Sequence, residues 1–289
     1  MKKIVVMLGF FSAILFADRG LVPFNPDITI FEPKQRALIA WNGWEEILLL
    51  TTDLNASDST TVIEILPLPS EPKIKKADIE TLRRAINLLN RRIYVAQKKN
   101  GGRATAAVSA PAAEITFHEK IGAHDISVAR LLEKDGFVDW VNSYIKNLGY
   151  DKEIILESHK ELVKDYIEEG FIWFVFDVIT LSRETKTLEP IQYRFRTKKL
   201  FYPLKITSLG SGSTTIELLI LTPRLLSRFP GLPITRIQLT HEPVSISKDE
   251  LMSIDDDIYE LLKDFGEMKL RIWKIEGMLN SFNRDLIAY

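Results

Sequence analysis

The stretch between Phe171 and Thr222 constrains the fold most strongly, because it predicts several β-strands in succession with polar breaks between them. Residues 171–181 are almost continuously apolar, as expected for a strand that is buried on both faces. Residues 191–196 alternate apolar and polar side chains, which is typical of a half-buried strand. Two further strands are predicted at 201–208 and 214–221. Because several antiparallel strands can bury a face and a lone hairpin cannot, we expect this stretch to form the core sheet.

The segments on either side of this stretch predict both strands and helices. Further strands are predicted at 28–31, 36–41, 44–52, 61–66, 114–119, 125–131, 235–241 and 268–278. Apolar side chains spaced three and four residues apart, or capping boxes, predict helices at 77–99, 136–148, 158–169 and 247–263. The predicted fold class is therefore α+β, with antiparallel sheets and a few packed helices.

The chain of 289 residues divides into four regions by its sequence patterns. These are a signal peptide at 1–17, a β-rich N-terminal region at 18–75, an inserted helix and flexible loop at 76–113, and an α+β core region at 114–289. We expect the loop of the insertion to be peripheral, because a Gly- and Ala-rich stretch without hydrophobic periodicity is typical of a linker.

The first residues have the pattern of a secretory signal peptide. Lys2 and Lys3 precede a short apolar run from Ile4 to Ala17, and cleavage is predicted after Ala17. The run is shorter than the roughly 20 apolar residues that a membrane-spanning helix needs, which favours cleavage over an uncleaved signal anchor. We therefore predict a secreted or cell-envelope protein, which is attached to a membrane only if this segment is retained.

Two further features matter for an exported protein. The chain has no cysteine, so no disulfide stabilises it and its stability depends on the size of its core. Asn55, Ala56 and Ser57 form a glycosylation sequon in a predicted polar loop, which makes Asn55 a candidate acceptor.

Charge and missing motifs argue against several functions. The formal net charge of −1 predicts no general attraction to nucleic acid. The sequence contains no nucleophile elbow, phosphate-binding loop or dinucleotide fingerprint, and it therefore indicates no cofactor. A Ser-His-Asp triad stays open, because its members can lie anywhere along a sequence.

Histidines and one unusual acid supply the remaining chemical candidates. His118 and His124 are each followed by an acidic residue, but their spacing fits no zinc signature. We expect structural histidines and keep a metal site as the weaker alternative. Asp177 interrupts the apolar run at 171–181. We expect it at a strand end or in a partly hydrated position, because a buried carboxylate is costly.

Two tryptophans are candidate binding residues. Trp41 and Trp44 flank Asn42 and Gly43, and an Asn-Gly pair between apolar runs is a strong signal for a hairpin turn. The two indoles either stack on a ligand such as a sugar ring or pack in the core.

Three arginines are candidates for a basic surface. Arg194, Arg196 and Arg236 lie on the polar sides of predicted strands, where they form either a patch for an acidic polymer or an ordinary solvated face. The partners that these residues suggest are an envelope polymer or another extracellular protein.

Several segments together resemble one known family through their order along the chain. They read RALIAWNGWEEILLL, EILPLPSEP, IGAHDISVARLLEKDGFVDWVNSYIKNLGY, DYIEEGFIWFVFDV and FYPLKITS. The residues that match the family pattern are Leu66, Pro67, Pro69, Gly122, His124, Asp125, Trp140, Gly149, Tyr150, Gly170, Phe171, Trp173, Tyr202, Pro203 and Leu204.

This order resembles the secreted bacterial and archaeal family called domain of unknown function 2330, over roughly Leu21 to the C-terminus. The chain departs from the family by lacking cysteine and by carrying the insertion at 77–113. The resemblance implies export and an α+β domain. It implies no activity, since the family has none that can be carried over.

Two function hypotheses follow. The first is a non-catalytic binding or scaffolding module of the cell envelope or extracellular space. The alternative is an exported hydrolase whose site is not evident from sequence. A cleft with His118 or His124 beside a carboxylate favours the enzyme, whereas a continuous exposed aromatic or basic surface favours the binding module.

Overall fold

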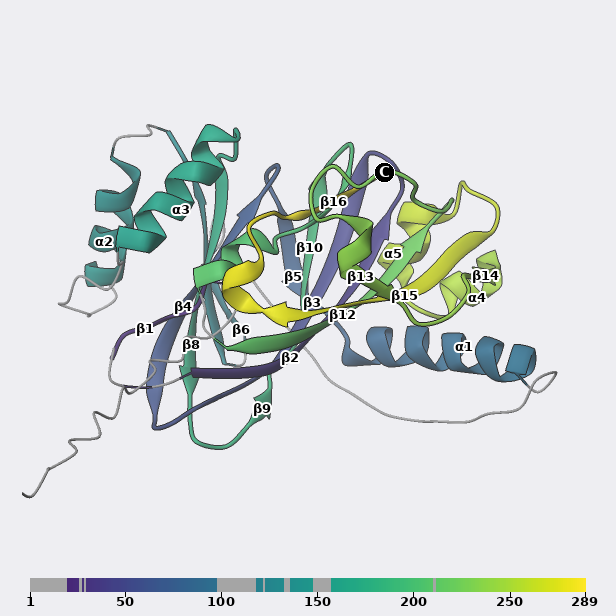
Figure 1. The fold of residues 1–289 in the computed structure, drawn as a ribbon, viewed down its shortest axis with the longest axis horizontal. Helices are drawn as coiled ribbons and strands as arrows, with labels where there is room; N and C mark the ends of the chain where they lie inside the picture. The colour runs from purple at the N-terminus through teal and green to yellow at the C-terminus, as the bar shows by residue number, and fades with distance from the viewer. Residues whose placement is uncertain are drawn as a thin grey trace, which may run out of the picture.

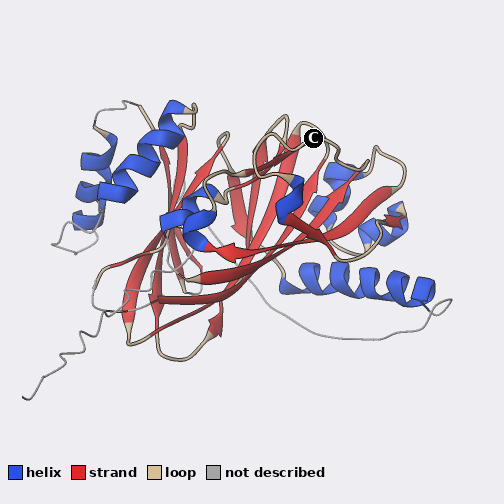
Figure 2. Ribbon diagram, viewed as in Figure 1, coloured by secondary structure: helices blue, strands red, loops and turns tan. Residues whose placement is uncertain are grey.

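The computed structural model describes residues 20–25, 28, 30–97, 118–121, 123–132, 136–147, 157–209 and 212–289. The predicted signal peptide at 1–17 and the predicted loop at 100–113 lie outside the described residues. Within the described part, no helix is both long and apolar enough to cross a membrane. Two packed β-sheets form the centre of the molecule, and helices cover the outer face of each sheet (Figures 1 and 2).

The smaller sheet contains five described strands, and all of its pairings are antiparallel. Their spatial order is β1 (Val22–Pro23), β4 (Thr60–Leu68), β8 (Trp173–Leu181), β7 (His124–Arg130) and β6 (His118–Ile121). Helices α2 (Phe137–Asn147) and α3 (Glu157–Glu168) cover its outer face, on the left in Figure 1.

The larger sheet contains nine described strands. Their main order is β13 (Ile237–Leu239), β15 (Met268–Met278), β12 (Ser213–Thr222), β2 (Ile30–Trp41), β3 (Glu45–Ala56), β10 (Ile191–Arg196) and β5 (Lys73–Lys76). In addition, β14 (Val244–Ile246) pairs with β15, and β9 (Lys186–Thr187) pairs with β3. Helices α1 (Ile79–Gln97), α4 (Lys248–Met252) and α5 (Asp256–Leu262) cover its outer face.

The prediction of purely antiparallel sheets is only partly correct. β12 and β2 pair in parallel, so the larger sheet is mixed and the fold is a sheet-dominated α+β structure. Parallel neighbours require a long crossover connection, and here most of the chain lies between β2 and β12. No local pattern in either strand reports such a distant pairing.

Successive side chains of a strand point to opposite faces of its sheet, so a central strand contributes to two cores. In β3, Leu48 and Leu50 belong to the core between the sheets, whereas Ile47 and Leu49 pack under the helices of the larger sheet. In the smaller sheet, Val175 of β8 joins the inter-sheet core, while its neighbours in the strand pack under α2 and α3. The result is four layers, with helices outside and two sheets inside.

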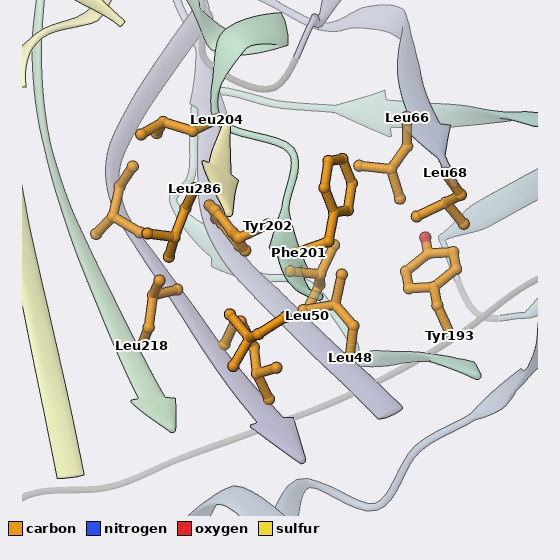
Figure 3. Packing of buried hydrophobic residues seen from close by; sticks show 14 of the residues in the cluster. Leu48, Leu50, Leu66, Leu68, Tyr193, Phe201, Tyr202, Leu204, Leu218 and Leu286 are labelled. Carbon is orange, nitrogen blue, oxygen red and sulfur yellow. The ribbon is translucent and has the colours of Figure 1, made fainter. Parts of the chain in front are cut away.

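A short third sheet closes one side of the inter-sheet core. It consists of β11 (Leu200–Tyr202) and β16 (Leu286–Ala288), which pair in antiparallel orientation. Phe201, Tyr202 and Leu286 pack among leucines of the two large sheets (Figure 3). The last strand of the chain is therefore part of the central core.

The strands between 171 and 222 do not form one sheet, so the predicted core sheet is wrong. β8 is the central strand of the smaller sheet, whereas β10 and β12 belong to the larger sheet. The apolar run of β8 is buried on both faces, as its sequence predicts, with helices on one side and the larger sheet on the other. Which sheet each strand joins depends on distant partners. The regions 18–75 and 114–289 both contribute strands to both sheets.

Most predicted element positions are confirmed, with three corrections. The strand predicted at 201–208 ends at Tyr202, and Lys205–Leu209 form a short 3-10 helix instead. The strands predicted at 28–31 and 36–41 form the single strand β2, which is irregular between Phe31 and Lys34. The helix predicted at 247–263 is divided, because Asp255 caps a second helix by accepting hydrogen bonds from the amides of Asp257 and Ile258. The capping box of Ser247 and Glu250 is present at the start of α4.

A buried carboxylate ties the C-terminal strand to the rest of the molecule. Asp285 Oδ1 accepts hydrogen bonds from Tyr166 Oη at 2.8 Å and from the backbone amide of Lys205 at 2.7 Å. Lys205 Nζ in turn lies 2.7 Å from Asp165 and 2.8 Å from Glu169 of the α3 segment. Burial raises the pKa of Asp285 to about 7 despite these hydrogen bonds.

Gly231 passes so close to this C-terminal segment that a side chain does not fit. A Cβ atom there would lie 2.1 Å from the backbone oxygen of Asp285. We expect Gly231→Ala to lower the free energy of unfolding by about 3 kcal/mol, because the clash is with backbone and no rotamer relieves it. Gly266→Ala is the matched control, since nothing lies within 4 Å of its added Cβ. Equal urea midpoints for the two variants would contradict this packing.

Candidate functional site

The turn between β2 and β3 separates the two candidate tryptophans. Asn42 Oδ1 accepts hydrogen bonds from the amides of Trp44 and Glu45, both at 2.9 Å, and Gly43 has a φ of 104°. The predicted Asn-Gly hairpin is therefore present. Trp41 is only 4% exposed and donates from Nε1 to the carbonyl of Thr197 at 3.1 Å, whereas Trp44 is 68% exposed.

Trp44 forms one wall of a shallow surface groove with a volume of about 670 Å³. We call it the Trp44 groove; its other lining residues are Asn42, Glu45, Pro69, Arg196, Thr197 and Lys198. Lys198 Nζ lies 5.7 Å from the centre of the Trp44 ring, within the range of a cation–π contact. Two of the five predicted binding residues, Trp44 and Arg196, thus meet at one surface.

The segment that carries the basic residues of the Trp44 groove is anchored by hydrogen bonds. The amide of Thr197 donates to the carbonyl of Trp44 at 2.9 Å. Ser70 Oγ donates to the carbonyl of Arg196 and accepts from its amide, each at 2.8 Å. These contacts join the β2–β3 turn, the end of β10 and the loop after β4, so the groove has a fixed shape.

Arg196 and Lys198 are exposed, and neither forms a salt bridge with another described residue. Arg194 differs, because its guanidinium lies 2.6 Å from Glu45 and is largely neutralised there. Arg236 lies near the opposite edge of the larger sheet, where it contacts Ser281 Oγ at 3.1 Å and the ring of Phe282. The three predicted arginines do not form one patch, since β10 and β13 are separated by four other strands.

A second cluster of ionisable side chains lies between the two sheets. His124 Nδ1 is 2.5 Å from Asp177 Oδ2, and the two residues are 3% and 2% exposed. Glu64 sits directly opposite Asp177 in the pairing of β4 with β8 and is also buried. The expectation of a partly hydrated Asp177 is therefore wrong, because a histidine partner from β7 compensates the burial of the carboxylate.

The environment of His124 favours its charged form. Burial alone would lower the pKa of the imidazole, but the charges of Asp177, Glu64 and Glu189 outweigh this effect and raise the pKa. A cavity of about 10 Å³ lies beside His124 and is lined from the larger sheet by Thr51, Thr52 and other residues. Such a volume has room for about one water molecule, so no substrate fits there.

The structure brings together no group of three or more histidine, aspartate or glutamate side chains able to hold a metal ion, as far as the described residues extend. The side chain of His118 lies outside them. Asn55 is half-buried near the end of β3 rather than in the predicted polar loop. Its sequon continues into the exposed turn before β4, and glycosylation of Asn55 stays a prediction.

Sequence reasoning missed Glu64 and Lys198. Glu64 is the sole acidic residue in β4, as Asp177 is in β8. The single acid in each otherwise apolar strand is the signal that could have found this cluster, because a buried acid requires a compensating partner. Lys198 had no signal of its own, because its approach to Trp44 depends on the pairing of β3 with β10.

Replacing the two tryptophans should change the stability of the protein by very different amounts. We expect Trp41→Ala to lower the free energy of unfolding by about 3–5 kcal/mol, because it removes a buried aromatic side chain and its hydrogen bond. We expect Trp44→Ala to change it by less than about 0.5 kcal/mol, because the side chain is mostly exposed. Chemical denaturation of both variants measures the difference. A large loss from Trp44→Ala would show that this indole is part of the core.

The buried pair of His124 and Asp177 should make a contribution to stability that depends on pH. Because the pKa of His124 is raised on folding, the stabilisation is complete below the unfolded value of about 6.5 and is lost as pH rises through the folded value. We expect Asp177→Asn to cost about 3–5 kcal/mol at pH 6 and clearly less at pH 9. Asp139→Asn, in the exposed first turn of α2, is the control. A pH-independent loss would contradict a charged His124.

Comparisons with known proteins agree with the order of motifs. A family model described as an uncharacterized protein conserved in bacteria (DUF2330) matches residues 17–228. The match ends before β13, so it is shorter than the predicted resemblance to the C-terminus. Glu64, His124 and Asp177 each come from one of the segments that carried the resemblance.

No curated protein matches this chain. Among solved structures, that of a mutated baculovirus P35 after caspase cleavage has a TM-score of 0.39 and 7% sequence identity. That alignment covers 89% of this chain and 99% of the viral chain, but a score this low supports no argument about fold or function. The family match, by contrast, spans most of the sequence, and the chain belongs to the family of uncharacterized bacterial proteins called DUF2330.

Proposed function

We propose that this protein is an exported, non-catalytic binding module of the cell envelope or extracellular space, and that its ligand occupies the Trp44 groove. The observation that carries the proposal is the exposed indole of Trp44 beside two cations, Arg196 and Lys198, that have no acidic partner among the described residues. An exposed tryptophan on a fixed turn supplies a large apolar face, which suits a sugar ring.

The charge of the groove favours an acidic polymer over a neutral one. Unpaired cations at the surface attract anionic ligands and raise their rate of association. The hydrogen bonds that hold Thr197 and Arg196 in place reduce the entropy that binding would cost. An envelope polysaccharide that carries carboxylates combines both features. A protein partner is the second choice, since it uses the same indole as a contact.

Export is supported by the N-terminal pattern. Lys2 and Lys3 precede the apolar run, and the family match begins at residue 17, where we place the cleavage site. We expect N-terminal sequencing of the protein recovered from cell fractions to start near Asp18. A mature protein that starts at Met1 in the cytosolic fraction would contradict export.

The alternative of an exported hydrolase rests on the His124–Asp177 pair, which has the hydrogen bond of a general base and its orienting acid. Both side chains are buried, and the adjacent cavity takes about one water molecule. A general base must reach the proton that it removes from a substrate. The geometry therefore supports the binding module better than the hydrolase.

Polygalacturonate, an acidic polysaccharide, and neutral dextran test the proposed ligand class. By calorimetric titration we expect polygalacturonate to bind, dextran to bind far more weakly, and added salt to weaken binding of the acidic polymer. Trp44→Ala and Arg196→Gln should each weaken binding about tenfold, as expected for contacts worth about 1.4 kcal/mol. Arg91→Gln removes another exposed arginine, from α1, and is the matched control.

The outcomes separate three cases. Binding that is lost in the two groove variants and kept in the control supports the proposal. Binding that Arg91→Gln weakens as strongly would indicate a general charge effect, and the proposed groove would be wrong. Equal binding of dextran and polygalacturonate would contradict the acidic ligand.

A further inference from the structure

A second groove lies beside β13 and β15, near the edge of the larger sheet that is opposite β10 and β5. Its volume is about 90 Å³, and we call it the Trp273 groove. Strands β12 and β15 form its base through Ile220, Thr222, Lys269, Arg271 and Trp273. The segment between β12 and β13, with the start and end of β13, forms its wall through Leu225, Leu226, Phe229, Ile234, Ile237 and Leu239.

Large apolar side chains are exposed around the Trp273 groove. Leu225 is 54% exposed, Ile234 is 46% exposed and Leu239 is 40% exposed. Single exposed leucines are ordinary, but three around one concave surface are the kind of apolar patch that marks an interaction site. Because these three side chains are largely outside the core, core packing does not explain the apolar character of the groove.

The wall of the groove is held in place by the C-terminal segment. The amides of Ser227 and Arg228 donate to the carbonyl of Tyr289 at 3.1 and 3.0 Å, and the amide of Leu232 donates to the carbonyl of Asp285 at 2.8 Å. The ring of Phe229 packs against Trp273 with its centre 5.5 Å away. The groove is thus preformed, which lowers the entropic cost of binding.

The charges at the groove have one sign. Lys269 and Arg271 line it, and no acidic residue does. Lys269 is already close to Glu267, at 3.3 Å. Arg271 donates from Nε to the carbonyl of His241 at 2.8 Å, which orients the guanidinium, and it forms no salt bridge with another described residue. An occupant that complements this surface is apolar with a carboxylate beside the apolar group.

We propose that the Trp273 groove docks an extended segment of a partner protein, which inserts one aliphatic side chain and places an acidic residue on Arg271. The groove volume of about 90 Å³ is smaller than the cavity of about 150 Å³ that accommodates benzene, so the groove takes no more than one small aliphatic side chain. The carboxylate forms a charge-assisted hydrogen bond with the guanidinium. This interaction is separate from ligand binding in the Trp44 groove, because the two grooves share no residue.

Two other occupants fit less well. In a symmetric dimer centred on this groove, Arg271 and Lys269 of one copy would face the same cations of the other copy, without an acid in the lining to neutralise them. A membrane surface binds protruding apolar side chains that insert between lipids, whereas here the apolar side chains surround a depression. A peptide segment matches both the shape and the charge.

A library of random linear peptides displayed on phage tests the proposal. The full-length protein serves as bait, and we expect the enriched peptides to share an aliphatic residue next to Asp or Glu. A synthetic peptide with this consensus should bind about tenfold more weakly to Leu239→Ser and Ile234→Ser, by fluorescence polarisation. Met252→Ser removes a similarly exposed apolar side chain, 52% exposed on α4, and this variant should bind the peptide normally.

A change in the peptide tests the charge without altering the fold of the protein. Replacing the acidic residue of the consensus peptide by its amide should weaken binding and remove its dependence on salt. Arg271→Gln should have the same effect on the original peptide, and should leave the binding of the amide peptide unchanged.

Four results would overturn the proposal. They are the absence of an enriched consensus, equal peptide binding by Leu239→Ser, sedimentation with phosphatidylserine vesicles that Leu239→Ser abolishes, and a concentration-dependent dimer that Leu239→Ser abolishes. The third result would assign the groove to a membrane surface, and the fourth would assign it to a second copy of the chain.

Discussion

The contact between the inner faces of the two sheets is the constraint on which the rest of the structure depends. It buries Leu48 and Leu50 of the larger sheet in one core with Leu66 and Leu68 of the smaller one, and Phe201 and Tyr202 of the short β11–β16 pair pack into the same core (Figure 3). Because each sheet also needs cover on its outer face, the helices lie outside and all four layers follow from one burial requirement. Without cysteine, no disulfide assists this packing.

Two carboxylates, Asp177 and Asp285, are buried where distant segments meet, and each has a hydrogen-bond partner that offsets part of the cost of its burial. Asp177 meets His124 across the pairing of β8 with β7, and Asp285 meets Tyr166 and Lys205 between α3 and the last strand. Such pairs contribute little net stability, but breaking one leaves an uncompensated polar group. They are therefore sensitive points that hold the layers and the chain end in one arrangement.

The two surface grooves are the sites at which we propose binding. Both are built at places where the sheet ends, one beside the β2–β3 turn and one beside β13 and β15. Each combines a tryptophan with at least one cation that forms no salt bridge with another described residue: Arg196 and Lys198 beside Trp44, and Arg271 beside Trp273. The Trp44 groove is open and sugar-sized, whereas the Trp273 groove is small and apolar, so the two suit different ligand classes.

The sequence by itself determined the local elements. The stripe of α1, the capping box of α4 and the Asn42-Gly43 turn depend on residues a few positions apart, so their patterns are sufficient. The tertiary structure alone decided that β8 and β10 lie in different sheets, that Asp177 finds His124, and that Trp41 is buried while Trp44 is exposed. The physical reason is that strand partners are chosen by contacts between distant segments, and a periodic pattern shows that a face is buried without showing what covers it.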